Sequence, residues 1–174
     1  MNEIYEIVKV CTENDGKNVD QRMMKLMEEI GELTTAVKVK KDAREIQLEA
    51  VDCLNCVFSL LVQFGETKED FFTLWESSVV RHYNTAKQAS PSRVSLNDVI
   101  ISAGWLAEAI LSVEKVKSNI YKNKDIKDVL HLGERMANYL IYVYFRAMRN
   151  PPYMFKKDIL EKCNKWAEKS GISL

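Results

Sequence analysis

The chain has 174 residues, with 25 Lys and Arg balanced by 25 Asp and Glu, so its formal net charge is zero. This balance lacks the basic surface typical of nucleic-acid binding, and we expect no nucleic-acid partner. Hydrophobic residues make up 47% of the chain, with only 6 Gly and 3 Pro. That composition excludes a disordered chain, disfavours a turn-rich all-β fold and favours long helices.

Apolar residues recur at helical spacing along almost the whole chain, and no segment alternates convincingly as a strand does. Turn and cap signals divide the pattern: Asn14-Asp15-Gly16 is a turn, Gly65 ends a helix, and Thr67 with Asp70 begins the next. We therefore predict an all-α fold. The predicted helices cover residues 3–12, 19–40, 44–64, 68–87, from Ser95 or Asn97 to 117, 126–149 and 154–169.

A Pro- and Ser-rich stretch near the middle of the chain divides it into two parts. We predict a first half over residues 1–88, a linker over 89–94 and a second half over 95–174. The second half reads as a degenerate pseudo-repeat of the first, in which Glu108 and Glu134 take the places of Glu32 and Glu49 while most other carboxylates are missing. We expect the second half to pack on the first without a full metal site of its own.

The chain begins Met-Asn-Glu-Ile-Tyr-Glu, which is acidic and does not resemble a signal peptide. The longest weakly charged stretch, residues 48–64, is too short and too charged to span a bilayer. We therefore expect a cytoplasmic protein with no membrane partner. The Cys53-x-x-Cys56 pair has no second pair to complete a zinc site, and we interpret the cysteines as small core residues.

The most informative residues are two pairs of carboxylates, Glu29 with Glu32 and Glu49 with Asp52. Each pair has i, i+3 spacing, which places both side chains on one face of a helix. Two such helices packed antiparallel would bring four carboxylates together, an oxygen-only ligand set that suits Mg²⁺ or Mn²⁺. Glu49 and Asp52 are the only charges in an otherwise apolar helix, where they are costly unless a cation compensates them.

The run Lys25-Leu-Met-Glu-Glu-Ile-Gly-Glu-Leu33, followed by Glu49-Ala-Val-Asp-Cys-Leu54, resembles the all-α NTP pyrophosphohydrolases, which include MazG-like proteins and dimeric dUTPases. The signature is Glu-Glu-x-x-Glu, a spacer and then Glu-x-x-Asp. Asn84-Thr-Ala-Lys-Gln88 is similar to the Asn-x-x-Arg-Gln element of these enzymes, with Lys in place of Arg. The resemblance covers residues 19–88 and implies a MazG-like helical bundle that commonly forms homodimers.

This resemblance implies Mg²⁺-dependent cleavage of a nucleoside triphosphate, possible also with Mn²⁺, to the monophosphate and pyrophosphate. It implies that Glu29 orients and deprotonates the attacking water, with Glu29 also a metal ligand. The implied metal ligands are Glu29, Glu32, Glu49 and Asp52, and the implied substrate-binding residues are Lys25, Asn55, Arg81, Asn84 and Lys87.

Two alternatives stay open at this point. Within the enzyme class, the preferred base is undetermined, and Asn55 stands where the dUTPase branch commonly has His, which weighs against a strict dUTPase. A dCTPase or a broader specificity is equally compatible. Outside the class, the chain could be a non-catalytic helical interaction module, which predicts neither nucleotide turnover nor stabilisation by a divalent metal.

Overall fold

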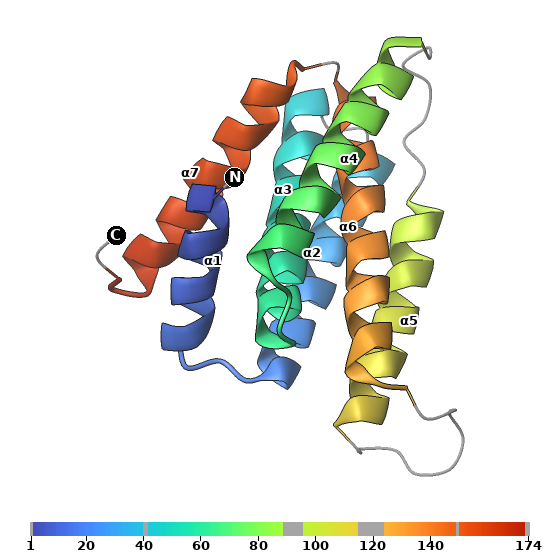
Figure 1. Ribbon diagram of the computed structural model, residues 1–174. Coiled ribbons are helices and arrows are strands. Elements are labelled where there is room, and N and C mark those ends of the chain that lie inside the picture. The colour runs from blue at the N-terminus through green and yellow to red at the C-terminus, as the bar shows by residue number, and fades with distance from the viewer. Residues whose placement is uncertain (1, 40–41, 89–95, 115–123, 149, 173–174) are drawn as a thin grey trace.

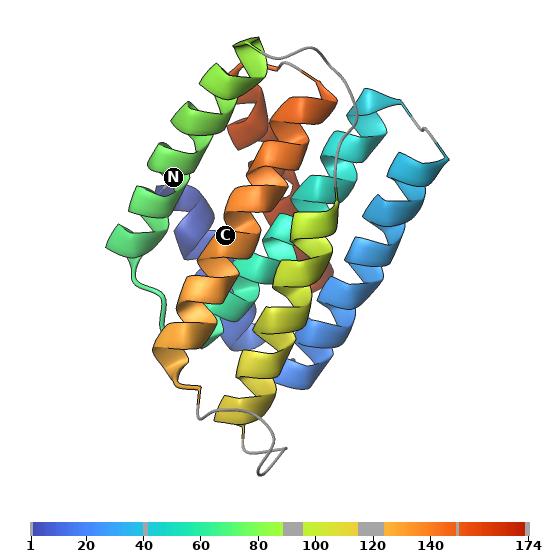
Figure 2. The same ribbon diagram turned by 90° about the vertical axis from the view of Figure 1, so that its right-hand side faces the viewer.

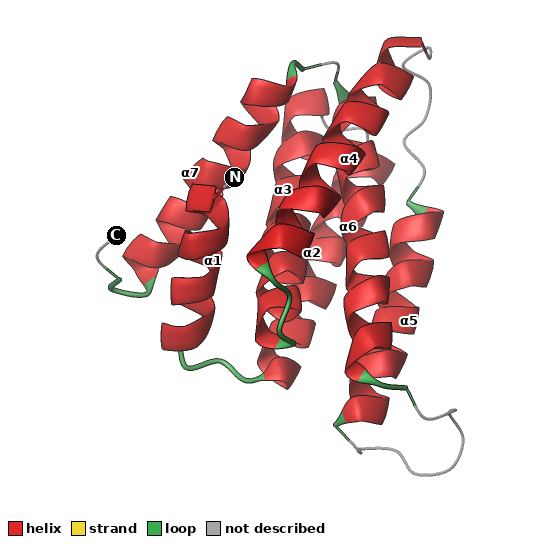
Figure 3. Ribbon diagram, viewed as in Figure 1, coloured by secondary structure: helices red, strands yellow, loops and turns green. Residues whose placement is uncertain are grey.

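The computed structural model describes residues 2–39, 42–88, 96–114, 124–148 and 150–172, with the side chains of 87 and 88 excluded. These residues form helices joined by short loops and contain no strand (Figure 3), so the predicted all-α fold is confirmed. The predicted linker, 89–94, lies outside the described residues. The helices are α1 (Asn2–Asn14), α2 (Val19–Lys38), α3 (Ala43–Gln63), α4 (Lys68–Gln88), α5 (Asn97–Val113), α6 (Ile126–Ala147) and α7 (Pro152–Lys169).

The helix ends follow local capping chemistry. The Thr67 hydroxyl accepts a hydrogen bond from the backbone N–H of Asp70 at 3.2 Å, as the capping pattern predicts. Gly65, which follows the end of α3, has φ of +93°, a conformation that favours glycine. The prediction that Ser95 or Asn97 caps α5 is wrong for Asn97, because Leu96 is the N-cap and Asn97 is already helical.

The core lies between α3 and α6, which pack against each other most extensively. Helix α2 flanks α3 and α5 flanks α6, while α1 and α7 cover the other side of α3 and α4 covers α6 (Figures 1 and 2). The two helices approach closely at Gly133, where an added Cβ would lie 2.6 Å from the Cδ2 of Leu61. The two sequence halves therefore share one core, since α3 comes from the first and α6 from the second.

The apolar helix predicted over residues 44–64 is α3, and its interior side chains such as Leu54 and Phe58 are fully buried. Trp75 stacks on Phe155 with ring centroids 4.8 Å apart, so it belongs to the core. Cys11, Cys53 and Cys163 are buried, as predicted for small core residues, whereas Cys56 is partly buried and lines the cavity described below; burial raises the pKa of the Cys56 thiol to about 12. Among the described helices, none combines the length and the apolar character needed to cross a membrane.

One core group carries a testable pH dependence. Glu66, in the turn after α3, is only 4% exposed, and its Oε1 has no hydrogen-bond partner. Burial, together with the negative charges of Glu134 and Asp70, raises the pKa of Glu66 from 4.5 to about 7. The folded state thus favours the protonated carboxyl, so this group stabilises the fold below pH 4.5 and that contribution is lost as the pH rises to 7.

We therefore expect Glu66→Gln to increase the free energy of unfolding by about 2 kcal/mol at pH 8 and to leave it unchanged near pH 4.5. Urea denaturation at both pH values measures the difference. Glu69→Gln, the same change at an exposed position nearby, is the control and should show no such pH dependence. Equal stabilisation of Glu66→Gln at both pH values would contradict the argument.

Candidate metal centre

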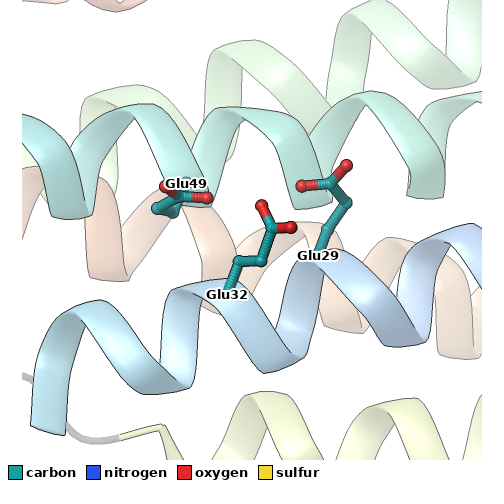
Figure 4. Close-up of side chains that lie close together, drawn as sticks. All are labelled: Glu29, Glu32 and Glu49. Atoms are coloured by element: carbon teal, nitrogen blue, oxygen red, sulfur yellow. The ribbon is translucent and has the colours of Figure 1, made fainter.

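Three glutamates from two neighbouring helices converge on one point. Glu29 and Glu32 lie one turn apart on α2, and Glu49 lies on the facing side of α3; the three carboxylates point into the space between the helices (Figure 4). One oxygen of each lies within 4.8 Å of the others. The helices are antiparallel, since Arg22 near the start of α2 bonds Ser59 near the end of α3. The i, i+3 spacing on α2 thus brings these side chains together as predicted.

The fourth predicted ligand, Asp52, does not belong to this group. Its Oδ2 lies 2.5 Å from the Nζ of Lys162 on α7, in an ion pair that the sequence analysis did not foresee. Asp52 still borders the same cavity as Glu29 and Glu32. The structure therefore brings together three of the four predicted ligands and gives the fourth a lysine partner.

The electrostatics of the group favour a bound cation. Glu29 is 8% exposed, and one of its carboxylate oxygens lies 2.6 Å from the Nζ of Lys25. Burial, followed by the negative charges of Asp52, Glu32 and Glu29, raises the pKa of Glu49. Burial and the neighbouring carboxylates therefore disfavour the charged form of Glu49, and a bound cation would relieve this cost. Clustered carboxylate oxygens are the donors that Mg²⁺ and Mn²⁺ prefer, so the residues present fit such an ion.

Glu29 and Glu32 border a cavity of about 330 Å³ between α2, α3 and α7, whereas Glu49 is not among its lining residues. On each helix the lining residues are spaced i, i+3, i+4 or i+7, so they lie on one face of the helix and form one wall of the cavity. The lining residues are Arg22, Lys25, Glu29 and Glu32 from α2, Asp52, Asn55, Cys56 and Ser59 from α3, Lys162, Lys165, Trp166 and Lys169 from α7, and Lys17 from the loop before α2.

Buried Arg22 closes one end of this cavity. Its guanidinium donates to the Oδ1 of Asp15 at 2.7 Å, to the carbonyl of Thr12 at 2.7 Å and to the hydroxyl of Ser59 at 2.6 Å. These bonds join α1, the loop after it and α3. We therefore assign Arg22 to the wall of the cavity, because the donors of both terminal nitrogens are bonded to protein acceptors, while its buried Nε has no partner.

The predicted substrate-binding residues separate into two groups. Lys25 and Asn55 line the cavity, and the Oδ1 of Asn55 accepts a hydrogen bond from the Sγ of Cys163 at 3.3 Å. Arg81 and Asn84 are exposed on α4, which packs against α6, and neither lines the cavity. The side chain of Lys87 lies outside the described part of the structure. Within one chain, the structure does not bring Arg81 and Asn84 to the carboxylates.

The contribution of α7 to the cavity was not among the predictions made from the sequence. Lys162, Lys165 and Lys169 follow one another at i, i+3 and i+7, a visible stripe, and Trp166 lies among them. The stripe alone could not show that it faces the carboxylates, since exposed lysines are common on surface helices.

Comparisons with known protein families, with curated proteins and with solved structures find no match to this chain.

Proposed function

We propose that the chain is a Mg²⁺-dependent nucleoside triphosphate pyrophosphohydrolase with a MazG-like arrangement of its catalytic half. The observation that carries the proposal is the convergence of Glu29, Glu32 and Glu49 beside a cavity to which five lysines contribute. A nucleoside triphosphate needs both features, because its phosphates require nearby cations and the carboxylates, which would otherwise repel it, can hold a divalent ion that offsets their negative charge.

A bound divalent cation would supply charge neutralisation at the phosphates and lower the pKa of a nearby water. Glu32 and Glu49 would hold that cation, and Asp52 would join them when its bond to Lys162 opens. Glu29, the most buried of the three clustered glutamates, would accept the proton of the attacking water. The new bond forms at the α-phosphorus as the bond to the bridging oxygen breaks, and pyrophosphate carries away the electron pair.

Two polar side chains would position the reactants. Lys25 holds the Glu29 carboxylate through the 2.6 Å ion pair, which fixes the direction from which the proton is taken. Asn55 lies one turn beyond Asp52 on the cavity wall, and its Nδ2 has no acceptor among the described residues. That amide is available to donate to the base or sugar of the nucleotide.

The test is pyrophosphate release from a panel of deoxynucleoside and ribonucleoside triphosphates with Mg²⁺ and with EDTA. We expect turnover with Mg²⁺ only. The order of kcat/KM among the substrates identifies the base preferred by the part of the cavity that Asn55 lines. If no triphosphate is cleaved and Mg²⁺ does not raise the melting temperature, the enzymatic proposal fails. A non-catalytic helical interaction module would then be the better account.

We also propose that the protein forms a homodimer and lies in the cytoplasm. Neighbouring helices α2 and α5 (Figure 2) expose large apolar side chains, among them Met24 at 73% and Trp105 at 42%. All four cysteines are free thiols, which fits a reducing compartment.

We expect Met24→Lys combined with Met27→Lys to reduce self-association in sedimentation equilibrium, whereas Lys9→Met, on α1, should not. A monomeric parent protein would contradict the dimer.

A further inference from the structure

The cavity is predominantly cationic despite its acidic cluster. Six of its lining residues carry positive charge and three carry negative charge, and one of the six, Arg22, is offset by its ion pair with Asp15. The positive residues are Lys17, Arg22, Lys25, Lys162, Lys165 and Lys169, and the negative ones are Glu29, Glu32 and Asp52. A site built only to hold a metal would not need this excess, whereas an anion as large as a polyphosphate would.

The positive charge is concentrated on α7. Lys162, Lys165 and Lys169 share one face of that helix, and buried Cys163 and Ala167 anchor its neighbouring face in the core. The helix is therefore held in a fixed rotation with its lysines toward the cavity. Lys165 and Lys169 have no ion pair among the described residues, so both ammonium groups are available to a ligand.

The charges are also ordered along the cavity. The antiparallel packing of α2 and α3 puts Glu32 and Glu49 at one end and Arg22 with Ser59 at the other. Helix α7 runs parallel to α3, since Asp158 bonds Arg44 and Lys162 bonds Asp52 farther along both helices. Lys169 therefore lies toward the end that Arg22 closes, about two helical turns beyond Lys162.

We propose that α7 forms an anion-binding rim, made of Lys162, Lys165 and Lys169, that holds the outer phosphates of the substrate. The identity of the anion as a polyphosphate rests on the proposed function. In this arrangement the α-phosphate lies at the carboxylates and the β- and γ-phosphates extend toward Lys169. Lys162 is paired with Asp52 in the structure, and if a cation were held at Asp52, the Lys162 ammonium group would be free to contact the phosphates.

The test is calorimetric titration of the full chain with inorganic triphosphate in EDTA at low salt. The variant is Lys165→Ala combined with Lys169→Ala. The matched control is Lys156→Ala combined with Lys157→Ala, which removes the same charge from exposed positions of α7 that do not line the cavity. We expect about a tenfold weaker affinity in the rim variant and less than about a twofold change in the control.

Equal losses in the two variants, or no binding by the parent protein, would overturn the rim. The titration needs neither metal nor turnover, so its outcome is separate from that of the hydrolysis assay. Binding that depends on Lys165 and Lys169, without any pyrophosphate release, would support the rim and contradict the enzymatic proposal. Pyrophosphate release with the same KM in both variants would contradict the rim alone.

Discussion

Replacing Glu49 by Gln is expected to lower kcat/KM for pyrophosphate release by about a hundredfold or more, since even the groups that support metal ligands cost 10- to 100-fold when they are mutated. The change keeps the size of the side chain and removes one of three converging negative charges. Mg²⁺ should correspondingly raise the melting temperature of the parent protein and have little effect on Glu49→Gln. Pyrophosphate release at several Mg²⁺ concentrations and thermal melts measure the two effects.

The melting temperature of Glu49→Gln shows whether a loss of activity comes from a folding defect. Burial and the neighbouring carboxylates raise the pKa of Glu49, so its ionised form destabilises the metal-free protein once the pH exceeds that pKa. In EDTA at pH 8, Glu49→Gln should therefore melt at or above the temperature of the parent. Glu76→Gln, on the exposed face of α4, is the matched control for turnover. Full activity in Glu49→Gln would contradict the metal centre.

The helices and the glutamate cluster could be predicted because both follow from local periodicity. A run as apolar as residues 48–64 must be buried, and this fixes which face of α3 carries Glu49. Spacing of i, i+3 places Glu29 beside Glu32 whatever the rest of the fold does. Only the short loop between α2 and α3 is needed to make those helices antiparallel neighbours.

The other walls of the cavity could not be predicted, because they depend on how distant helices pack. The resemblance suggested that Arg81 and Lys87 of α4 supply the phosphate-binding charge. In the structure, α4 buries Phe71, Trp75 and Val79 in the core, and its main contacts are with α6. Helix α7 covers α3 instead. Both helices are amphipathic and lysine-bearing, so periodicity does not distinguish them.

The pairing of Asp52 with Lys162 illustrates the same limit. From the sequence we interpreted Asp52 as a costly charge in an apolar helix and expected a metal to compensate it. A lysine 110 positions later does so in the structure. Compensation of a charge can be predicted from one helix, whereas the choice between a metal ion and a side chain requires the tertiary contacts.

The second large expected effect is on the free energy of unfolding, and it concerns the bonds that attach α7 to the bundle. Asp158, on α7 and only 2% exposed, accepts hydrogen bonds from both terminal nitrogens of Arg44 on α3, each at 2.5 Å. The hydroxyl of Tyr144 on α6 donates to its Oδ2, also at 2.5 Å. Burial and the Asp158 carboxylate raise the pKa of Tyr144, so this hydroxyl remains a donor. One carboxylate therefore holds three helices together.

We expect Asp158→Asn to lower the free energy of unfolding by about 3 kcal/mol, because the new amide presents a donor to Arg44 and leaves buried groups unpaired. Urea denaturation measures the loss. Lys157→Ala, at the adjacent exposed position, should change it by less than about 0.5 kcal/mol. A loss below about 1 kcal/mol in Asp158→Asn would mean that solvent replaces the ion pair at the partly exposed Arg44.

The same substitution also tests whether the attachment of α7 positions the rim. Asp158 lies about one turn before Lys162, so a loosened start of α7 should displace the lysines while leaving Glu29, Glu32 and Glu49 in place on α2 and α3. Under conditions where Asp158→Asn is still folded, we expect weaker binding of inorganic triphosphate with an unchanged response of the melting temperature to Mg²⁺. Equal weakening of both would show that the two parts of the cavity do not respond separately.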